Sequence, residues 1–294
     1  MDGFIIIDKA SGMSSYDVIR SLKRLQRFKK IGYIGTLDRN ATGILPVAIN
    51  EGVKLIPFFE NQKKVYRARL LLGITTDTFD IEGRVIKEVV LERFEGGMIK
   101  EVLKGFVGRI TQQIPIYSSK KINRRPLYKL AREGIQIEPP LKEVEIYSIE
   151  LLGYTHPYVD IEVECSKGTY IRTLANDFGE RLGCGATLYS LKRIAHGDFK
   201  EDEAVGIEGI TSKEVLIDHL IPLKGVLKGF KEVYVEDAIE RFLRYGMPIP
   251  LIGNIKEWKD KEFVKIVNKR EALIGIGMAD LPSRTIKIKR LINN

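Results

Sequence analysis

One carboxylate, Asp38, lies between Gly35 and Gly43 in a segment with apolar runs on both sides. Glycine lets a backbone turn sharply or approach a ligand closely. An acid in such a loop can therefore face a substrate, where it could act as a nucleophile or accept a proton. Taken alone, the pattern is more typical of a surface turn, because Asp and Gly are common turn residues. A catalytic interpretation requires partners further along the chain.

Arg172 is a candidate partner for this acid. The sequence predicts a helix capped by Thr169, which places Arg172 at the third helical position. A cation in the first turn of a helix is unfavourable by about 0.3–1 kcal/mol, because it opposes the helix dipole. This indicates an anionic partner, and an adjacent arginine would keep Asp38 ionised and shield it from water. An incidental surface arginine is the alternative.

Two tyrosines could complete such a site. Tyr66 lies on the apolar face of a predicted strand, so a core tyrosine is its default interpretation. A stacking platform for a nucleobase is the functional alternative. Tyr170 precedes the same helix turn as Arg172 and could line the same pocket.

Hydrophobic spacing predicts the elements that must position these residues. A capping box at Ser14 precedes a helix with one apolar face. Alternation of apolar and polar residues predicts strands at 65–72 and 159–165. A Ser-Lys-Gly turn leads from the second strand into the helix that carries Arg172, and Gly183 is the expected stop of that helix.

The composition changes near the C-terminal end. Residues 222–229 are rich in Pro, Gly and Lys, which is typical of a linker. Short elements are predicted after it, namely a helix at 235–245 and strands at 263–267, 272–278 and 285–291. We therefore expect a large domain at 1–228 and a small β-barrel-like module at 231–294.

The composition also limits the class of protein. With 294 residues and 44% hydrophobic content, the chain can bury a sizeable core, and no apolar run approaches a membrane span. Cys165 and Cys184 form no C-x-x-C pair, and the three histidines have no metal-ligand spacing. We therefore expect a cytoplasmic protein with two reduced, buried thiols and no metal site.

Positive charge is concentrated in two segments of a chain whose net charge is +9. Residues 20–30 contribute +6 with no acid, and residues 117–134 contribute +5 from six bases and one acid. A solvated helix face normally interleaves acids with bases. The two basic segments therefore indicate a polyanion-binding surface, with nucleic acid as the expected partner.

Several long motifs resemble those of TruB-type tRNA pseudouridine synthases, in the order found in that family: GYIGTLDRNATGILPV, KKVYRARLLLGITTDTFDIEG, QQIPIYSSKK…LYKLAREG and CSKGTYIRTLANDFGERLGCGATLYSLKRIA. The resemblance covers residues 1–228, and the tail is similar to a PUA module. It implies a mixed α/β (α+β) fold with a central, largely antiparallel sheet flanked by helices and loops. It also implies isomerisation of the T-loop uridine at tRNA position 55 to pseudouridine, without metal or cofactor.

The same resemblance implies roles for individual residues. Asp38 would be the catalytic aspartate, Arg172 its ion-pair partner, and Tyr66 the tyrosine that stacks on the base and can accept the proton from C5. The substrate site would also contain Tyr170, Leu191, Lys9, which supports the site, and Asp80, which contacts RNA. An insertion at about 113–138 is similar to the T-arm clamp of stand-alone enzymes. The side chains expected to contact the RNA backbone are then those of Lys29, Lys30, Lys120, Lys121, Arg124, Arg125, Lys129 and Arg132.

Two positions depart from the family pattern. This chain has Tyr33 where most members have His, and Arg39 where most have Pro. The family's histidine is implicated in filling the space that the flipped base leaves. Tyr33 could still stack there, because its ring offers a π-face. Because His is absent, the chain gives no support to a catalytic role for an ionisable histidine at this position.

Three other functions compete with this interpretation. A non-catalytic RNA-binding or tRNA-folding protein would explain the charge but not the motifs around Asp38 and Arg172. An RNA methyltransferase is disfavoured, because no G-x-G-x-x-G follows a predicted strand. A dyskerin-like, guide-dependent synthase is disfavoured by the clamp insertion and the compact N-terminus. We expect a monomer that binds the tRNA T-arm without a guide RNA and without a membrane.

Overall fold

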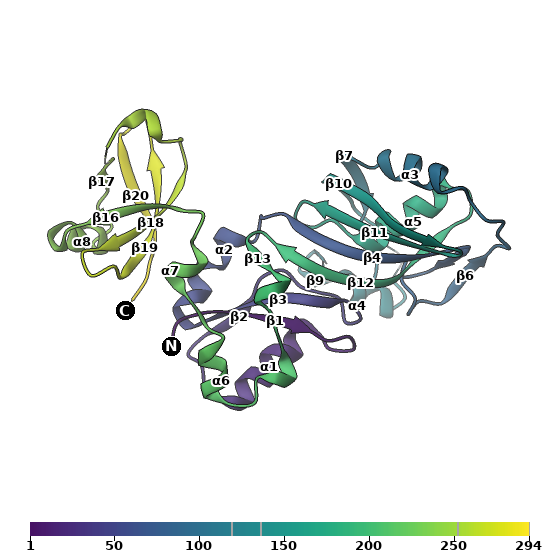
Figure 1. The fold of residues 1–294 in the computed structure, drawn as a ribbon, viewed down its shortest axis with the longest axis horizontal. Coiled ribbons are helices and arrows are strands. Elements are labelled where there is room, and N and C mark those ends of the chain that lie inside the picture. The colour runs from purple at the N-terminus through teal and green to yellow at the C-terminus, as the bar shows by residue number, and fades with distance from the viewer. Residues whose placement is uncertain (119, 136, 252, 294) are drawn as a thin grey trace.

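The computed structural model describes residues 1–118, 120–135, 137–251 and 253–293. Within them, one large sheet runs through most of the chain, and the C-terminal residues form a smaller sheet (Figure 1). Eleven described strands form the large sheet: β1 (Gly3–Lys9), β2 (Ile31–Tyr33), β3 (Thr42–Ile49), β4 (Lys64–Leu72), β7 (Gly108–Gln113), β10 (Leu141–Thr155), β11 (Tyr158–Cys165), β12 (Ala186–His196), β13 (Phe199–Lys200), β14 (Val205–Gly206) and β15 (Ile221–Pro222).

The large sheet is mostly antiparallel. Its main order is β14-β1-β3-β12-β4-β11-β10-β7, and β2, β13 and β15 pair at its margins. Among the described pairs of this sheet, β1 with β14 and β12 with β3 are parallel. The expected mixed fold with a central, largely antiparallel sheet is confirmed. Strands β3, β12 and β4, from distant parts of the chain, are thereby neighbours.

Strand β4 lies between β12 and β11 and separates the core from the opposite face of the sheet. Tyr66, Ala68 and Leu70 are buried, whereas Arg67 and Arg69 are exposed. This is the period of two that the sequence predicted. Both arginines make ion pairs with acids on β11, so the exposed face is also ordered.

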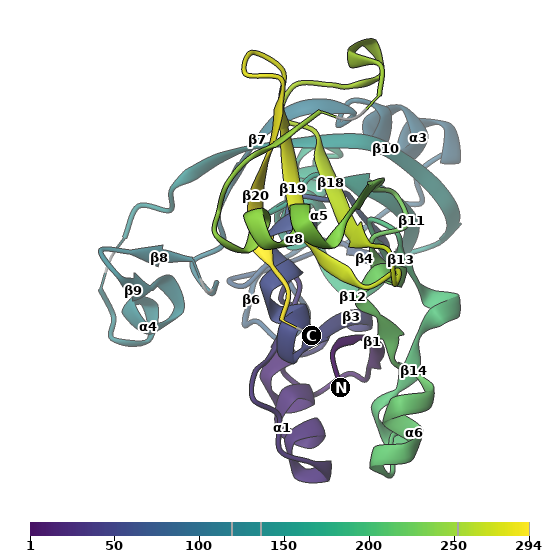
Figure 2. The ribbon, with the colours of Figure 1, turned by 90° about the vertical axis from the view of Figure 1, so that its left-hand side faces the viewer.

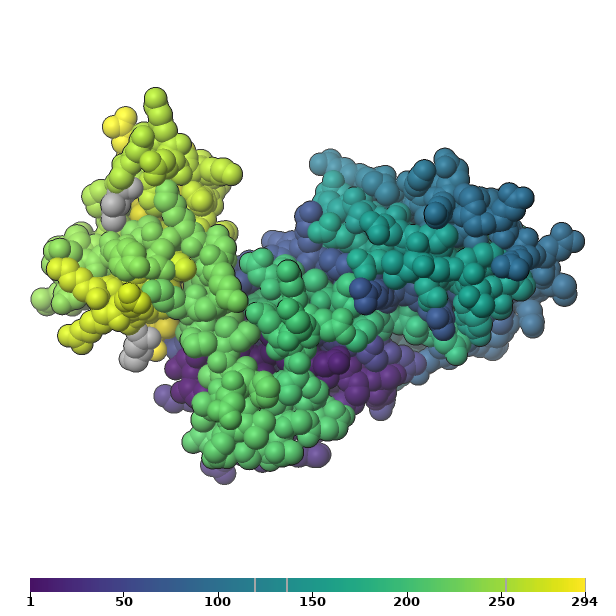
Figure 3. All heavy atoms as spheres, in the orientation of Figure 1, coloured from purple at the N-terminus to yellow at the C-terminus, as the bar shows by residue number. Residues whose placement is uncertain are grey.

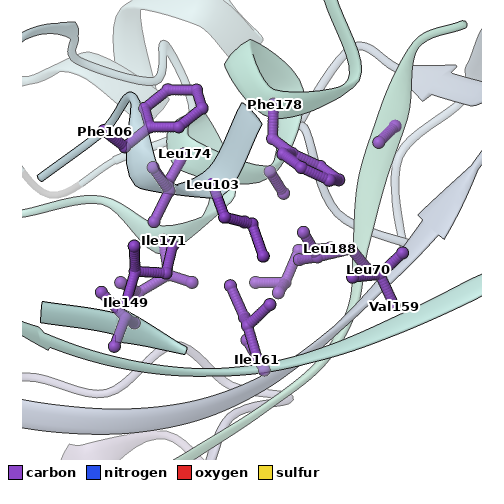
Figure 4. Packing of buried hydrophobic residues seen from close by; sticks show 14 of the residues in the cluster. Leu70, Leu103, Phe106, Ile149, Val159, Ile161, Ile171, Leu174, Phe178 and Leu188 are labelled. Carbon is purple, nitrogen blue, oxygen red and sulfur yellow. The ribbon is translucent and has the colours of Figure 1, made fainter. Parts of the chain in front are cut away.

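Two helices, α3 (Gly96–Lys104) and α5 (Ile171–Arg181), pack on the apolar face of β4, β11 and β12. Burial of each large apolar side chain there contributes about 1.5–3 kcal/mol. Figure 4 shows this packing, with labels on Leu70, Leu103, Phe106, Ile149, Val159, Ile161, Ile171, Leu174, Phe178 and Leu188. The core therefore fixes α5, which carries Arg172, directly against the strand that carries Tyr66.

Helix α5 begins one residue later than expected. Its N-cap is Tyr170 and not Thr169, so Arg172 is the second helical residue and not the third. The Thr169 hydroxyl donates instead to the carbonyl of Ser166 in the preceding turn. The helix ends as predicted: Gly183 follows the C-cap in the left-handed region, with φ +79°.

Helix α1 (Ser15–Leu25) packs against strands β1 and β3 of the large sheet (Figure 2). The capping box predicted at Ser14 is present, with both reciprocal hydrogen bonds to Asp17. Val18, Ile19 and Leu22 are buried on its inner face. Its basic side chains Arg20, Lys23 and Arg24 are exposed.

Short elements connect the larger ones. They are η1 (Asn50–Leu55), α2 (Ile56–Phe59), β5 (Ile74–Thr76), β6 (Val85–Glu88), β8 (Lys121–Ile122), β9 (Arg125–Pro126), α4 (Leu127–Arg132), η2 (Glu201–Glu203), η3 (Ile207–Gly209), α6 (Lys213–Asp218) and α7 (Leu223–Val226). Strands β5 and β6 pair with one another, as do β8 and β9. The β8, β9 and α4 elements lie in the insertion predicted at 113–138, of which residues 119 and 136 lie outside the described residues.

The linker predicted at 222–229 is wrong as a description of this segment. Strand β15 pairs with β1, and α7 follows at once. Leu223, Val226 and Leu227 are buried in a core cluster that also contains Phe4 and Phe59. Apolar residues at the helical spacing of this segment outweigh its Pro, Gly and Lys content, because they bury against the sheet.

The C-terminal residues form a five-stranded sheet in the order β16-β18-β19-β20-β17. Its elements are β16 (Lys231–Val235), α8 (Asp237–Arg244), β17 (Ile249–Pro250), η4 (Ile255–Glu257), β18 (Phe263–Asn268), β19 (Leu273–Asp280) and β20 (Thr285–Leu291). The predicted helix and three strands are confirmed to within two residues. Figure 3 shows these residues as a lobe joined to the remainder of the molecule along its lower part. None of the helices in the described residues is long and apolar enough to cross a membrane.

Candidate active site

The loop at 34–41 joins β2 to β3 and carries Asp38. The glycines on either side have φ values of +68° (Gly35) and +94° (Gly43), a region that favours glycine. A Cβ at Gly43 would lie 2.2 Å from the carbonyl oxygen of Arg193 on β12. Glycine there allows β3 to pack directly on β12, and this contact sets where the Asp38 loop leaves the sheet.

Asp38 meets Arg172 across the site. Its Oδ2 atom lies 3.0 Å from Nε of Arg172, so the ion pair that the sequence predicted is present. The Arg172 side chain is 6% exposed, whereas the Asp38 side chain is 55% exposed. The expectation that the carboxylate is shielded from water is therefore wrong for the protein alone. The loop presents Asp38 from its outer side, and only the guanidinium is buried.

Other groups hold the buried guanidinium in place. Nη1 of Arg172 donates to the carbonyl of Thr78 and to Oδ2 of Asp80, both at 3.2 Å, and Nη2 donates to the carbonyl of Tyr117, also at 3.2 Å. Among the described residues, Nε has no aligned hydrogen-bond acceptor, so its contact with Asp38 is ionic only. Asp80, for which the resemblance implied an RNA contact, lies here as a second carboxylate on Arg172.

Two cavities share Asp38, Arg172 and Leu191 in their walls. The smaller one, of about 450 Å³, is also lined by Tyr66 and Tyr170. The larger one, of about 900 Å³, extends over Asp80 and the basic residues Arg67, Arg69 and Lys192. The smaller cavity combines aromatic and aliphatic side chains with charged groups of both signs, among them Asp38, Arg172 and Arg193, so it can hold a planar polar ligand.

The aromatic residues of the smaller cavity differ in burial. Tyr66 is 8% exposed, and burial raises its pKa to about 12, so the phenol is neutral at physiological pH. Burial also raises the pKa of Tyr170, which is half-buried. Tyr33 and Leu191 line the same cavity with intermediate exposure. A planar ligand could therefore contact Tyr66, Leu191 and Tyr33 in one place.

Lys9 supports the Asp38 loop from beneath. Its side chain is fully buried, and Nζ donates to the carbonyls of Met13 (2.7 Å), Ala10 (2.9 Å) and Arg39 (3.0 Å). Burial lowers the pKa of Lys9 to about 8, while the charge of Asp38 opposes this shift. Lys9 thus fixes the backbone next to Asp38.

The unusual residue Arg39 also braces this loop. Its Nε donates to the carbonyl of Gly12 at 2.7 Å, and the amide of Gly12 donates back to the carbonyl of Arg39 at 3.0 Å. An arginine at this position therefore ties the loop to the turn after β1.

The basic side chains expected to contact RNA lie outside both cavities. Those of Lys29 and Lys30, in the loop between α1 and β2, are exposed. So are those of the insertion, namely Lys120, Lys121, Arg124, Arg125, Lys129 and Arg132. Arg125 is engaged by Glu133, and the guanidinium of Arg132 lies 5.7 Å from the ring centroid of Tyr128. These residues are therefore exposed and lie outside the walls of both cavities.

The structure adds two buried residues that the sequence did not single out. Arg193 on β12 is fully buried and lines the smaller cavity. Gln112 on β7 is 1% exposed, and its side chain accepts from the amide of Tyr170 (3.0 Å) and donates to the carbonyl of Tyr170 (3.2 Å). A polar residue at a core-facing position of a strand was the available signal for both.

Comparison with known proteins gives consistent matches. Residues 23–171 match the N-terminal domain of the TruB family pseudouridylate synthases, and residues 172–228 match the C-terminal domain of tRNA pseudouridylate synthase B. The tRNA pseudouridine synthase B of Clostridium kluyveri is 38% identical over 98% of this chain and 99% of its own length. That of Syntrophus aciditrophicus is 40% identical over 94% of this chain and 90% of its own length.

A solved structure has the same fold at lower identity. It is described as an H/ACA RNP bound to a substrate RNA containing 2′-deoxyuridine. Its TM-score to this chain is 0.75 at 20% identity, with 99% of this chain and 85% of the other covered. At that identity the likeness concerns the fold alone.

Proposed function

Because this chain belongs to the TruB family of pseudouridylate synthases and forms pseudouridine in tRNA, we propose that its target is uridine 55 of the T-loop. The observation that carries the proposal is the meeting of Asp38 with Arg172 beside a cavity that contains Tyr66. A carboxylate paired with a cation, beside a ring that can stack on a base, suits the detachment, rotation and re-attachment of one uracil. A protein that only binds RNA has no use for this arrangement.

The reaction begins with extrusion of the target base. The uridine is stacked inside a folded loop, so flipping it out is unfavourable by a few kcal/mol. Contacts between RNA phosphates and the exposed basic side chains of α1 and of the insertion offset this free-energy cost. The flipped base enters the cavity of about 450 Å³, where it stacks on Tyr66 and packs against Leu191. Tyr33 and Tyr170 complete the walls.

Asp38 then acts on the nucleoside. Arg172 pairs with the carboxylate and, through the buried carbonyl contacts of its guanidinium, fixes its position. The carboxylate attacks the base or the sugar, or takes a proton from the ribose, and the glycosidic bond breaks. The base turns within the closed pocket and rejoins through C5. Bound RNA covers the exposed side of Asp38 and so removes it from water.

The remaining parts of the chain have supporting roles in this proposal. Residues 1–228 form the catalytic domain, with the insertion at 113–138 as an RNA clamp. Residues 231–294 form a PUA-like RNA-binding domain. The enzyme acts as a cytoplasmic monomer, with no guide RNA and no cofactor. The net charge of the chain, +9, is suited to a polyanionic substrate.

Replacement of Asp38 by Asn tests the proposal. The Asp38→Asn protein is expected to bind a T-arm stem-loop as the wild type does, and to lose pseudouridine formation by about 10³-fold or more, because an amide of the same size replaces the reacting carboxyl group. Binding is measured by filter retention at fixed salt, and product by carbodiimide treatment and primer extension.

Glu82→Gln is a matched control, since Glu82 is an exposed acid in the wall of the larger cavity. It is expected to retain activity. Product at a position other than 55 would contradict the proposed target. Near-normal product from Asp38→Asn would favour the non-catalytic alternative and remove Asp38 from the reaction.

A further inference from the structure

Arg193 is the largest fully buried side chain in the described residues. Its Nε donates to the carbonyl of Ile44 at 2.9 Å, and its Nη2 donates to the carbonyl of Gly35 at 3.0 Å. Nη1 has no hydrogen-bond partner among the described residues. A Cβ on Gly35 would lie 3.0 Å from Nη1, so the glycine leaves room for the guanidinium.

The positive charge of Arg193 is not neutralised by an acid. Within the described residues it makes no ion pair, and Tyr66 is the one titratable group that favours its charge. The nearby buried groups His196 and Lys64 are themselves basic, and burial lowers the pKa of both, to about 2 for His196 and about 8 for Lys64. Burial of a cation without a counter-charge is strongly unfavourable. The hydrogen bonds of Arg193 to backbone carbonyls do not explain why its charge is buried, because a neutral donor would make the same hydrogen bonds.

The group that faces this charge is Tyr66. Residues 66 and 193 are directly opposite each other in the β4–β12 pairing, so their side chains project from the same face of the sheet. Both line the smaller cavity. Burial raises the pKa of Tyr66, and the Arg193 guanidinium opposes that shift. Arg193 therefore favours any negative charge that develops on the phenolic oxygen.

We propose that Arg193 is a positioning residue for Tyr66, whose phenol it stabilises in the anionic state while Tyr66 carries a proton from C5 to N1 of the flipped uracil. The inference rests on the proposed function and goes beyond it, because the family resemblance assigned no role to Arg193. Arg193 makes no ion pair with Asp38 in the described residues, and it lies behind Tyr66 in the wall of the smaller cavity. Its effect passes through the phenolic oxygen alone.

The proton transfer balances. When the N1–C1′ bond breaks, its electron pair stays on the uracil, and the phenolic proton of Tyr66 moves to N1. The phenolate then lies beside the Arg193 guanidinium. After the base turns, C5 forms a bond to C1′, and the hydrogen on C5 leaves as a proton to the phenolate. The C5–C6 double bond is restored, Tyr66 is neutral again, and one proton has moved from C5 to N1.

Three variants of the full chain test this role: Arg193→Gln, Arg193→Lys and Tyr66→Phe. Gln keeps a donor for the carbonyl contacts but removes the charge, whereas Lys keeps the charge. Single-turnover rates are measured on a T-arm stem-loop, with RNA affinity at fixed salt and cooperative unfolding as controls for binding and folding. A second substrate carries deuterium at C5 of the target uridine, so that the removal of that hydrogen is observed directly.

The expected result separates charge from structure. Arg193→Gln should lower the single-turnover rate by about 100-fold with RNA affinity unchanged, and Arg193→Lys should recover about tenfold of that loss. Arg193→Gln should also show a C5 deuterium isotope effect larger than that of the wild type. In the Tyr66→Phe background, Arg193→Gln should change the rate by less than about threefold, because the phenol is already absent.

Four results would overturn the inference. They are a wild-type rate in Arg193→Gln, an unchanged isotope effect, additive losses in the double variant, and loss of cooperative unfolding in both Arg193 variants, which would assign the residue to the fold alone. Failure of the proposed function is distinct from all of these. In that case the wild-type chain itself makes no pseudouridine at the target position.

Discussion

At the scale of single residues, the site depends on groups that are buried without being neutral. Arg172 is buried under Asp38, Lys9 is buried under the same loop, and Arg193 is buried under Tyr66. Each donates hydrogen bonds to backbone carbonyls, and Arg172 is in addition paired with Asp38 and Asp80. The carboxylate of Asp38 is thereby left free on its outer side.

His196 gives this burial a measurable pH dependence. Burial lowers its pKa from 6.5 to about 2, so the folded chain holds it neutral while the unfolded chain takes up a proton below pH 6.5. The free energy of unfolding should therefore fall as pH drops from 6.5, by about 1.4 kcal/mol per pH unit from this group. Urea unfolding of the wild type and of His196→Gln at pH 7.5, 6.0 and 5.0 measures it.

The variant should lose less stability than the wild type over that range. His156→Gln is the matched control, since His156 is exposed, and it should follow the wild-type pH dependence. Equal slopes in all three proteins would show that His196 does not set the acid sensitivity.

The sequence predicted some residues of the site and not others, for physical reasons. Asp38, Tyr66 and Arg172 stand in motifs with turn, strand and helix signals, so the local pattern marks them. Arg193 and Gln112 carry no local signal beyond a polar residue in a strand. Their importance comes from contacts across the sheet or between β7 and α5, which no spacing along the chain encodes. The exposure of Asp38 was also mispredicted, because burial of one partner does not bury the other.

At the scale of elements, the start of α5 depends on β7. The helix has no side-chain cap of its own, and Gln112 satisfies both the amide and the carbonyl of its N-cap residue Tyr170. Thr173 adds a hydrogen bond to the carbonyl of Gln113, at 3.0 Å. Capping from another strand explains why a local rule placed the cap at Thr169.

Gln112→Leu is expected to destabilise the chain by about 1–3 kcal/mol, because it leaves the amide of Tyr170 without a partner, whereas the carbonyl keeps its bond from the amide of Leu174. The start of α5 should shift, and pseudouridine formation should fall while RNA affinity is retained. Urea unfolding and single-turnover rates check both effects. The neighbouring Gln113→Leu, which changes an exposed side chain and leaves its backbone contact in place, should alter neither. Equal behaviour of the two variants would contradict the capping role.

At the scale of the whole molecule, the C-terminal sheet is joined to the large sheet by apolar packing. Val267, Leu273, Ile276 and Ile292 share a core cluster with residues of β1, α2 and α7. Phe58 and Phe263 pack edge to face with centroids 5.0 Å apart. Further contacts join Lys54 Nζ to the carbonyl of Leu291 (3.0 Å) and the amide of Asn293 to Glu51 Oε2 (2.7 Å). The composition predicted a linker between the two sheets, but apolar side chains of both pack in one shared core cluster.

Removal of residues 231–294 should therefore destabilise what remains. Truncation would expose several apolar side chains, each worth about 1.5–3 kcal/mol when buried. The shortened chain should unfold at a lower temperature than the full chain and aggregate more readily, as thermal unfolding and light scattering would show. Phe263→Ala should produce a smaller change of the same sign, and Tyr234→Ala, at an exposed position, should produce little. An unchanged unfolding midpoint in the truncated chain would contradict the shared core.

The carbonyls of Thr78 and Tyr117 converge on one guanidinium from loops that are separate in the chain. Thermodynamic reciprocity follows from that convergence. A ligand that binds the insertion around Tyr117 and strengthens the hydrogen bond to Arg172 also raises the affinity of the nearby cavity for a base. A base bound in the cavity then raises the affinity of the insertion for that ligand by the same factor. Binding of RNA to the insertion and binding of the base in the cavity are then cooperative, although the two ligands do not contact each other.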